Sequence, residues 1–134
     1  MKVNLNTESI RLISLFQEVT GAHVLDSYEN EELYFVVSEG EYGLAVGKNG
    51  MKIKRVENIL RKQVKVYEYS PDFETFVKNL IPHVKEISNQ EGKVEVKVAA
   101  NDRSKVIGKA GYRAKIIEHF IKRFFSDVES FKVK

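Results

Sequence analysis

Apolar and polar positions follow a helical period in two stretches of the chain's first half. Apolar side chains recur every three or four residues over 7–20, and Gly21 follows them as a stop signal. A second helix is predicted over about 51–62. Its inward side chains are expected to be Ile53, Val56, Ile59 and Leu60. Both stretches therefore predict amphipathic helices that pack by one face.

Between these helices the pattern is typical of β-strands. Residues 22–28 and 32–38 are rich in apolar, β-branched and aromatic side chains, and the three polar residues between them predict a hairpin turn. A short helix is predicted before the glycine turn at 47–50, and residues 64–67 predict a closing strand. The predicted order is helix, strand, strand, short helix, glycine turn, helix, strand.

The second half begins at a predicted helix start. Ser70 can cap the helix, Pro71 suits the first helical position, and Asp72 complements the helix dipole. Pro82 is predicted to end this helix, because proline cannot continue it.

A second hairpin and two more helices are predicted after it. A strand over 84–89 leads into residues 93–99, where valines alternate with charged side chains. Asn101 or Asp102 is predicted to cap a short helix that ends at a second glycine turn. A longer helix is predicted over about 111–125, with Ile116, Ile117, Phe120 and Phe124 inward, and the sequence VESFKVK closes as a strand.

The two halves match when the sequence is shifted by 61 residues. Gly47, Lys48 and Gly50 then fall on Gly108, Lys109 and Gly111. The apolar positions follow the same shift without a gap, so that Phe16, Val37 and Val56 fall on Val77, Val98 and Ile117. A shared hydrophobic rhythm with few identities indicates two copies of one fold. We therefore predict an α+β protein of two domains, residues 1–69 and 70–134.

The composition excludes several classes of function. The chain has 134 residues, of which 43% are hydrophobic and none is cysteine, so disulfides, cysteine-ligated zinc and thiol catalysis are excluded. The N-terminal MKVNLNTESI has no apolar run, and no stretch approaches the ~20 apolar residues of a membrane span. We therefore expect a cytoplasmic protein.

Positive charge is concentrated at the two glycine turns, although the net charge is only +3. Residues 47–65 and residues 103–123 each contain seven basic side chains and one acid, whereas the rest of the chain is acidic. A solvated helix face would explain one such segment, but two copies at matching positions favour an anionic partner.

A Gly-x-x-Gly turn that opens a helix suits a phosphate. The glycines remove side chains that would keep another backbone away and permit backbone angles that other residues resist. The following helix directs its unpaired N–H groups and the positive end of its dipole toward the turn. Lys48 and Lys109 add a cation at the same point of each copy.

These residues carry a family resemblance that covers nearly the whole chain. Val46 to Ile53, VGKNGMKI, resembles the (Ile/Val)-Gly-x-x-Gly-x-x-Ile signature of KH domains, and the order of elements resembles their type II topology. IGKAGYRA at 107–114 matches the core of the signature, with Ala114 in its last position. The stretch GEYGLAVGKNGMKIKRVENIL followed by VKVYEYS is similar to the first KH domain of NusA-type transcription termination and antitermination factors, especially the short archaeal form with a KH pair.

The resemblance implies binding of single-stranded RNA. In KH domains the GxxG loop clamps the backbone of about four nucleotides, while bases lie over an adjoining groove. Carried over by position, the clamps are Gly47, Lys48, Asn49 and Gly50, and Gly108, Lys109, Ala110 and Gly111. Candidates for flanking phosphate contacts are Lys52, Lys54, Arg55, Arg103, Arg113 and Lys115. Groove walls are expected from Leu44, Ala45, Val46 and Ile53 with residues near Val37, and from Val106, Ile107 and residues near Val98.

No catalytic constellation is found in the sequence, and we expect a monomer without cofactor or metal. The segment from Gly43 to Lys48 has one residue too few between its glycines for a nucleotide-binding P-loop, and the three histidines lack metal-ligand spacing. Two alternatives stay open: a tandem-KH RNA-processing or ribosome-assembly factor, and a module that docks on RNA polymerase with little RNA binding of its own. Bacterial NusA proteins also carry a polymerase-binding region for which 134 residues leave no room, so polymerase contact is not assigned to any residue.

Overall fold

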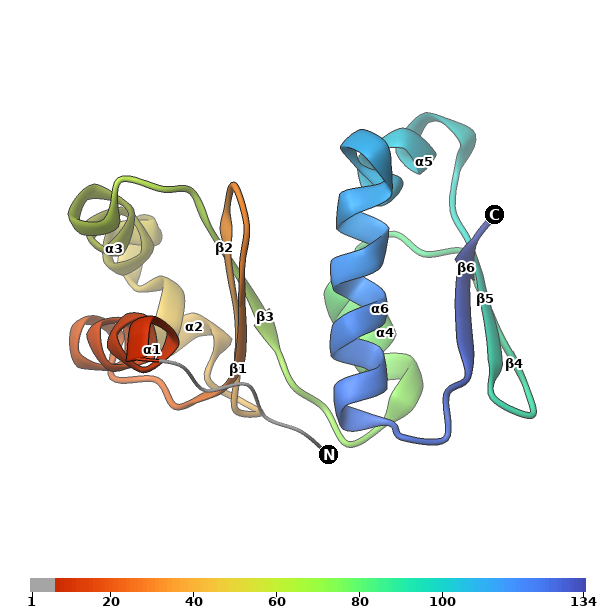
Figure 1. Cartoon of the computed structure of the whole chain (residues 1–134), viewed down its shortest axis with the longest axis horizontal. Coiled ribbons are helices and arrows are strands. Elements are labelled where there is room, and N and C mark those ends of the chain that lie inside the picture. The colour runs from red at the N-terminus through yellow and green to blue at the C-terminus, as the bar shows by residue number, and fades with distance from the viewer. Residues whose placement is uncertain (1–6) are drawn as a thin grey trace. The chain divides into compact units, whose positions relative to one another are not determined.

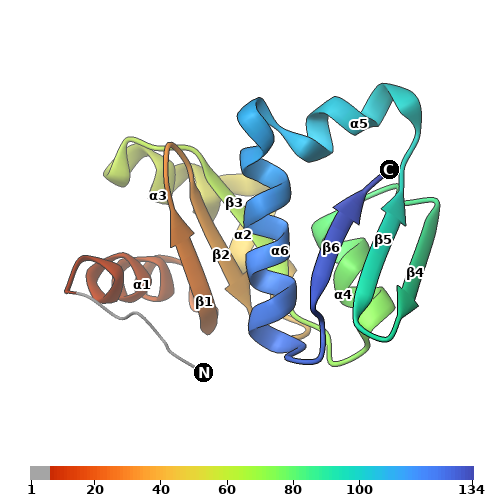
Figure 2. The same cartoon turned by 45° about the vertical axis from the view of Figure 1, so that its right-hand side comes forward.

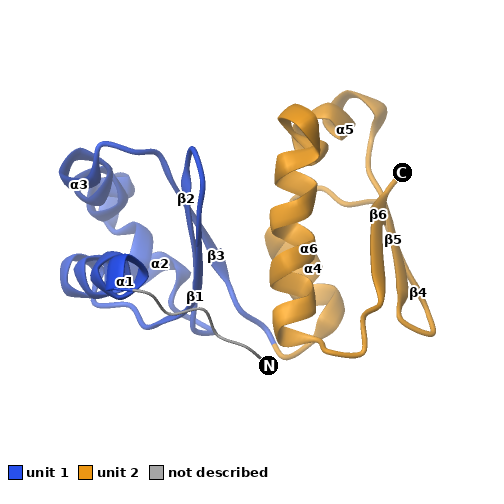
Figure 3. Cartoon of the chain, viewed as in Figure 1, with its two compact units in different colours: residues 1–70 blue, residues 71–134 orange. Residues whose placement is uncertain are grey.

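The computed structural model describes residues 7–134. The first six residues of the predicted first domain lie outside the described residues. The chain divides into two compact units, of which unit 1 ends at Ser70 and unit 2 begins at Pro71 (Figure 3). Each unit contains one three-stranded sheet with helices. The predicted α+β fold class with two KH-like halves is confirmed.

Unit 1 has the order of elements that the sequence predicts. Its elements are α1 (Thr7–Thr20), β1 (Val24–Glu29), β2 (Leu33–Val37), α2 (Tyr42–Val46), the 3₁₀ turn η1 (Lys48–Gly50), α3 (Met51–Leu60) and β3 (Val64–Glu68). In the sheet, β2 is central and pairs antiparallel with β1 and parallel with β3. The helices cover one face of this sheet (Figure 1).

The core of unit 1 lies between that face and the helices. Phe16 of α1 stacks on Phe35 of β2 with ring centroids 4.2 Å apart. Around this pair pack Leu12, Ala22, Val24, Leu33, Val37, Ala45, Val56, Val64 and Val66. The inward face predicted for α3 is correct at Val56 and partly at Ile53 and Leu60. It is wrong at Ile59, which is 50% exposed because it lies beside the buried stripe of the helix.

Unit 2 repeats the order of unit 1. Its elements are α4 (Phe73–Leu80), β4 (Glu86–Gln90), β5 (Lys93–Lys97), α5 (Ala100–Ile107), the 3₁₀ turn η2 (Lys109–Gly111), α6 (Tyr112–Phe124) and β6 (Ser130–Val133). The central strand β5 pairs antiparallel with β4 and parallel with β6, as in unit 1. In Figure 2 these strands lie side by side with α4 behind them and α5 at one end of the sheet.

The core of unit 2 uses alternate residues of β5. Val94 and Val96 are buried, whereas Lys93 and Lys97 are exposed, which confirms the predicted alternation. The helix α6 buries Ile116, Ile117, Phe120 and Ile121 and contacts α4 and β6. Phe124, predicted to face inward, is only half-buried and meets Phe76 of α4 edge to face, with ring centroids 5.5 Å apart.

Two predicted helix caps are wrong. The cap of α4 is Asp72, whose carboxylate accepts hydrogen bonds from the backbone N–H and the hydroxyl of Thr75, at 3.0 and 2.6 Å. Ser70 is buried before the helix begins. The helix α5 begins at Ala100 with Ala99 in the cap position, so Asn101 and Asp102 both lie inside the helix. A capping side chain therefore marks the start of α4 but not that of α5.

Candidate nucleic-acid interface

The first glycine turn is a tightly defined loop between α2 and α3. Gly47 has φ 76° and ψ 172°, and Asn49 and Gly50 both have left-handed backbone, with φ 55° and 73°. The N–H of Gly50 donates to the carbonyl of Gly47 at 3.1 Å, which closes the turn. Lys48 and Asn49 are exposed at its tip.

The second turn has the same backbone conformation. Gly108 has φ 76° and ψ 176°, Ala110 has φ 55°, and Gly111 has φ 75°. At these three positions no backbone angle differs between the two loops by more than 4°. The N–H of Gly111 donates to the carbonyl of Gly108 at 3.2 Å, and Lys109 and Ala110 are exposed. The sequence repeat is therefore a structural repeat at the loops.

The first glycine of each loop has two reasons to be glycine. Its φ and ψ fall in a region that is essentially restricted to glycine. A Cβ atom at Gly47 would lie 2.6 Å from Cγ of Lys52, and one at Gly108 would lie 2.8 Å from Cβ and 3.0 Å from the backbone N of Arg113. In both units the residue five positions later thus packs over the glycine and holds the loop against the helix.

The helix that follows each loop has an uncapped N-terminus. The cap positions are Gly50 and Gly111, which have no side chain that could cap the helix, and neither first turn contains an acid. The first N–H groups of a helix lack intrahelical partners, and they point with the positive end of the dipole toward the loop. The N–H groups of Gly50 and Met51, like those of Gly111 and Tyr112, donate to carbonyls within the turns. Each loop therefore presents the positive end of a helix dipole to a solvent-exposed anion, beside Lys48 or Lys109.

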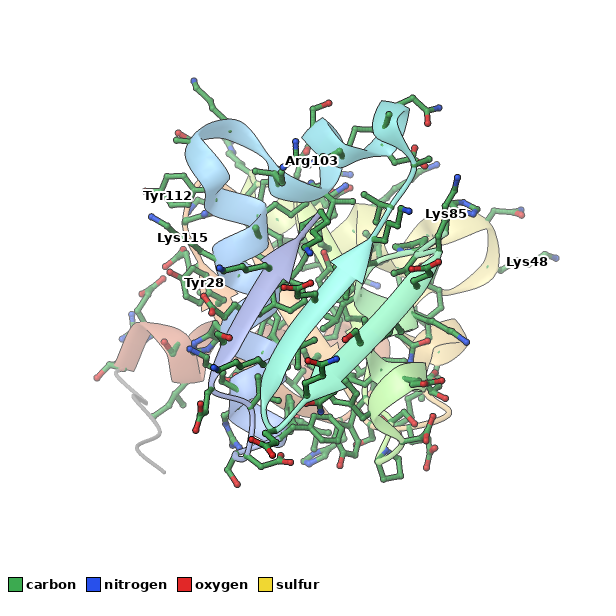
Figure 4. The ribbon with its side chains drawn as sticks, turned by 90° about the vertical axis from the view of Figure 1, so that its right-hand side faces the viewer. Tyr28, Lys48, Lys85, Arg103, Tyr112 and Lys115 are labelled. Carbon is green, nitrogen blue, oxygen red and sulfur yellow. The ribbon has the colours of Figure 1, made fainter. Side chains whose placement is uncertain are left out.

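The predicted flanking cations differ in where their charges lie. The Lys52 ammonium donates to the carbonyl of Thr20 at 2.8 Å, so it stabilises the C-terminal end of α1 and does not extend from the loop. Arg113, its counterpart, is half-buried against Gly108. By contrast, the other predicted flanking cations have exposed side chains: Lys54 and Arg55 on α3, Arg103 on α5 and Lys115 on α6. Figure 4 shows Arg103 and Lys115 within unit 2.

The predicted groove walls are only partly available to a ligand. Ala45 is buried in the core, so it is wrong as a groove wall in direct contact with bases. Val37 and Val98, near which further groove walls are expected, are buried as well. In unit 1 Leu44 is 43% exposed, and Val46 and Ile53 are half-buried. In unit 2 Val106 and Ile107 are half-buried. Partly exposed apolar surface therefore remains on the helices that flank each loop.

Two residues that directly follow the loops were not singled out from the sequence. Met51 opens α3 and Tyr112 opens α6, and both side chains are exposed, at 66% and 54%. The available signal was their matching place in the repeat, where a large apolar residue follows the second glycine.

Other kinds of site have little support in the part of the chain that the structure describes. Residues 7–134 contain no group of three or more potential metal-ligating side chains, and no helix among them is long and apolar enough to cross a membrane. A shallow hollow of about 280 Å³ lies on the sheet of unit 2, away from the loop, lined by Glu86, Ser88, Glu95, Val96, Lys97 and Lys134. There a hydrogen bond and ion pair from Lys134, at 2.8 Å, lower the pKa of the Glu95 carboxyl.

Comparisons with known proteins identify the family of the chain. Residues 11–86 match the KH domain family. A protein of Methanococcus vannielii named "Probable transcription termination protein NusA" is 44% identical over 81 residues, which are 60% of this chain and 47% of that protein. The protein of that name from Thermoplasma acidophilum is 29% identical over 140 residues, covering 99% of this chain and 96% of the relative.

A solved structure has the same fold. The crystal structure of APE1850 matches with a TM-score of 0.74 and 36% identity, over 97% of this chain and all of that one. The chain spans about half the length of two curated relatives, with 47% and 44% of their residues covered. These similarities confirm the resemblance found in the sequence, and the chain belongs to the KH domain family, with relatives among its archaeal NusA-type members.

Proposed function

We propose that the chain binds single-stranded RNA by clamping its sugar-phosphate backbone with two loops, Gly47–Gly50 and Gly108–Gly111. The observation that carries this proposal is the repeated loop conformation, which places an exposed lysine beside the start of a helix at two places in one chain. Backbone N–H groups at a helix start favour phosphate oxygens, and the exposed lysines add charge that a purely structural turn does not need.

The clamp is proposed to read the shape and charge of the backbone. Main-chain donors contact phosphates without regard to base identity, so they position the strand, while bases over the adjoining apolar surface supply any sequence preference. Leu44, Val46 and Ile53 provide that surface in unit 1, and Val106 and Ile107 provide it in unit 2. The exposed cations Lys54, Arg55, Arg103 and Lys115 then add phosphate contacts outside the loops.

We further propose that this binding serves transcription termination or antitermination in the cytoplasm, with RNA polymerase or another transcription factor as a candidate protein partner. The names of the relatives support this role, and the KH fold supports RNA as the ligand. The chain is proposed to act as a binding protein and not as an enzyme.

The test reverses the charge of both loops. A variant with Lys48→Asp, Asn49→Asp, Lys109→Asp and Ala110→Asp should lose binding to single-stranded RNA, because the aspartates repel phosphate. These four side chains are exposed, so circular dichroism should show an intact fold. Fluorescence anisotropy of a labelled RNA pool measures the affinity, and the wild-type affinity should fall as salt rises.

A control variant separates loop chemistry from net charge. Lys78→Asp, Lys93→Asp and Lys132→Asp change the net charge by the same amount at exposed positions outside the loops. This control should keep most of the affinity. If the loop variant binds RNA as tightly as wild type at moderate salt, the clamp is wrong, and a protein-docking module becomes the better explanation.

A further inference from the structure

The two loops have the same backbone conformation, but the side chains beside them differ. Because their dihedral angles agree within 4°, a functional difference between the copies has to come from the residues they carry. The first position of the following helix is Met51 in unit 1 and Tyr112 in unit 2. At this equivalent position unit 1 therefore carries a flexible thioether and unit 2 carries a flat aromatic ring.

Tyr112 stands out in unit 2 by its exposure. It is 54% exposed, and among residues 71–134 it is the single large hydrophobic side chain that is exposed to this degree. The others in the described part of the chain all belong to unit 1: Ile10, Tyr42, Leu44, Met51 and Ile59. An exposed tyrosine offers a large apolar ring with a polar tip, so the open ring beside the loop is available to a contact outside the chain.

The position of Tyr112 directs its ring toward the loop. Side chains of a helix lean toward its N-terminus, and Tyr112 is the first residue of α6. Lys115 lies three positions later, on the same side of the helix, and Figure 4 shows both side chains extending outward from α6. Along the chain Tyr112 lies three residues from the loop cation Lys109 and three from the helix cation Lys115.

We propose that Tyr112 stacks on a nucleobase adjacent to the clamped phosphate, an inference that rests on the proposed RNA-binding function. Every base has a π-face, so the contact tolerates sequence variation and adds affinity that does not depend on charge. Met51 offers no ring at the matching place. The second unit would thus hold one base by stacking, whereas the first unit holds its strand by backbone and aliphatic contacts.

The affinity test compares three variants on a pool of single-stranded RNA 12-mers of mixed sequence. Tyr112→Ala should weaken binding at least about fivefold, the lower end of what loss of one stacked base produces. Tyr112→Phe should bind within twofold of wild type, because the ring remains. Tyr112→Ala should also keep the wild-type slope of affinity against salt, since no phosphate contact is lost, whereas Lys109→Asp should reduce that slope.

A second readout uses the absence of tryptophan from the chain. Tyr112→Trp introduces a single tryptophan, and its fluorescence should be quenched when RNA stacks on it. The matched control is Ile10→Trp, which places the single tryptophan at a similarly exposed site, 51% exposed, on α1 of the other unit. The control should show little quenching.

The outcomes distinguish this inference from the proposed function. If wild type binds the RNA pool but Tyr112→Ala binds equally well and Tyr112→Trp is not quenched, stacking by Tyr112 is wrong and the two-loop clamp remains. If wild type does not bind the pool, both are wrong. If Tyr112→Ala weakens binding and also lowers the slope of affinity against salt below that of wild type, the tyrosine supports the loop and does not stack.

Discussion

The glycines of each loop meet different physical demands. Gly47 and Gly108 adopt backbone angles available essentially to glycine alone, and the stem of Lys52 or Arg113 fills the space where a side chain would begin. Gly50 has left-handed backbone, but no atom lies within 4 Å of the place that its Cβ would occupy, and Gly111 is the same. The first glycine therefore shapes the loop, while the second mainly leaves it open.

This difference predicts unequal effects of alanine in one loop. Gly47→Ala should destabilise unit 1 by about 1–3 kcal/mol because of its backbone region, and by more where Lys52 has to move. Gly50→Ala should cost about 1 kcal/mol, since left-handed backbone is only mildly unfavourable for alanine. Urea unfolding followed by circular dichroism measures both, and equal losses would contradict the distinct roles.

Individual side chains also mark where inference from sequence ends. The sequence predicted Lys52 as a phosphate ligand because it lies in a basic segment directly after the loop. Its ammonium instead meets the carbonyl of Thr20, 32 residues earlier in the chain. Composition and spacing identify a basic helix, but only the folded position of α1 determines which of its cations remains available.

At the scale of the elements, the periodicity of the sequence correctly predicted which helices and strands exist and in what order. It predicted less well where each of them begins. The alternating valines of β5 and the apolar stripe of α1 required no knowledge of the partner element. The start of α4 was harder to predict, because Ser70 and Asp72 are both acceptable caps by residue type. Asp72 is the cap since its carboxylate reaches the N–H and hydroxyl of Thr75.

The cap predicts an acid-sensitive contribution to the stability of unit 2. Hydrogen bonds from the Thr75 hydroxyl and N–H lower the pKa of Asp72 below its ordinary value of 3.8. Because the folded pKa is lower than the unfolded one, this contribution is present above pH 3.8 and is lost as pH falls through the folded pKa. Urea midpoints measured from neutral to acidic pH should therefore fall more for wild type than for Asp72→Asn.

Thr75→Val provides the control for this cap. It removes the hydroxyl, which has the largest effect on the pKa of Asp72, but keeps the backbone donor. Its acid sensitivity should lie between those of wild type and Asp72→Asn. Parallel curves for all three proteins would mean that the cap does not couple to protonation.

The two central strands show where the repeat diverges. In β2 all five residues are buried, including Tyr34 and Val36, which alternate with the core residues. The corresponding residues of β5 are the half-buried Glu95 and the exposed Lys97. The copies are therefore closest at the loops and least alike on the outer faces of their sheets, a contrast that the 61-residue repeat alone did not predict.

For the whole molecule, the proposed clamp would gain affinity from the presence of two loops in one chain. A single clamp on about four nucleotides makes few contacts, and its phosphate contacts weaken as salt rises. When one strand occupies both loops, the second contact forms at a high effective concentration, which can raise the overall affinity by orders of magnitude.

Dependence on RNA length follows from this linkage. With RNA long enough for both loops, Lys48→Asp alone or Lys109→Asp alone should weaken binding at least about tenfold. With tetranucleotides, either variant should lose no more than about half of the binding sites. Isothermal titration calorimetry gives the affinity and stoichiometry, and single-variant losses that do not depend on RNA length would show that the loops act independently.

The packing of Lys52 and Arg113 over the first glycines has a consequence for protein engineering. The loop shape is held by backbone angles and by helix residues, so the four tip positions 48, 49, 109 and 110 contribute little to either core. Positions 49 and 110 favour residues that accept left-handed backbone, such as asparagine or glycine, while 48 and 109 are unrestricted in this respect. A combinatorial library at these four sites should retain the scaffold while varying the side chains that the loops expose.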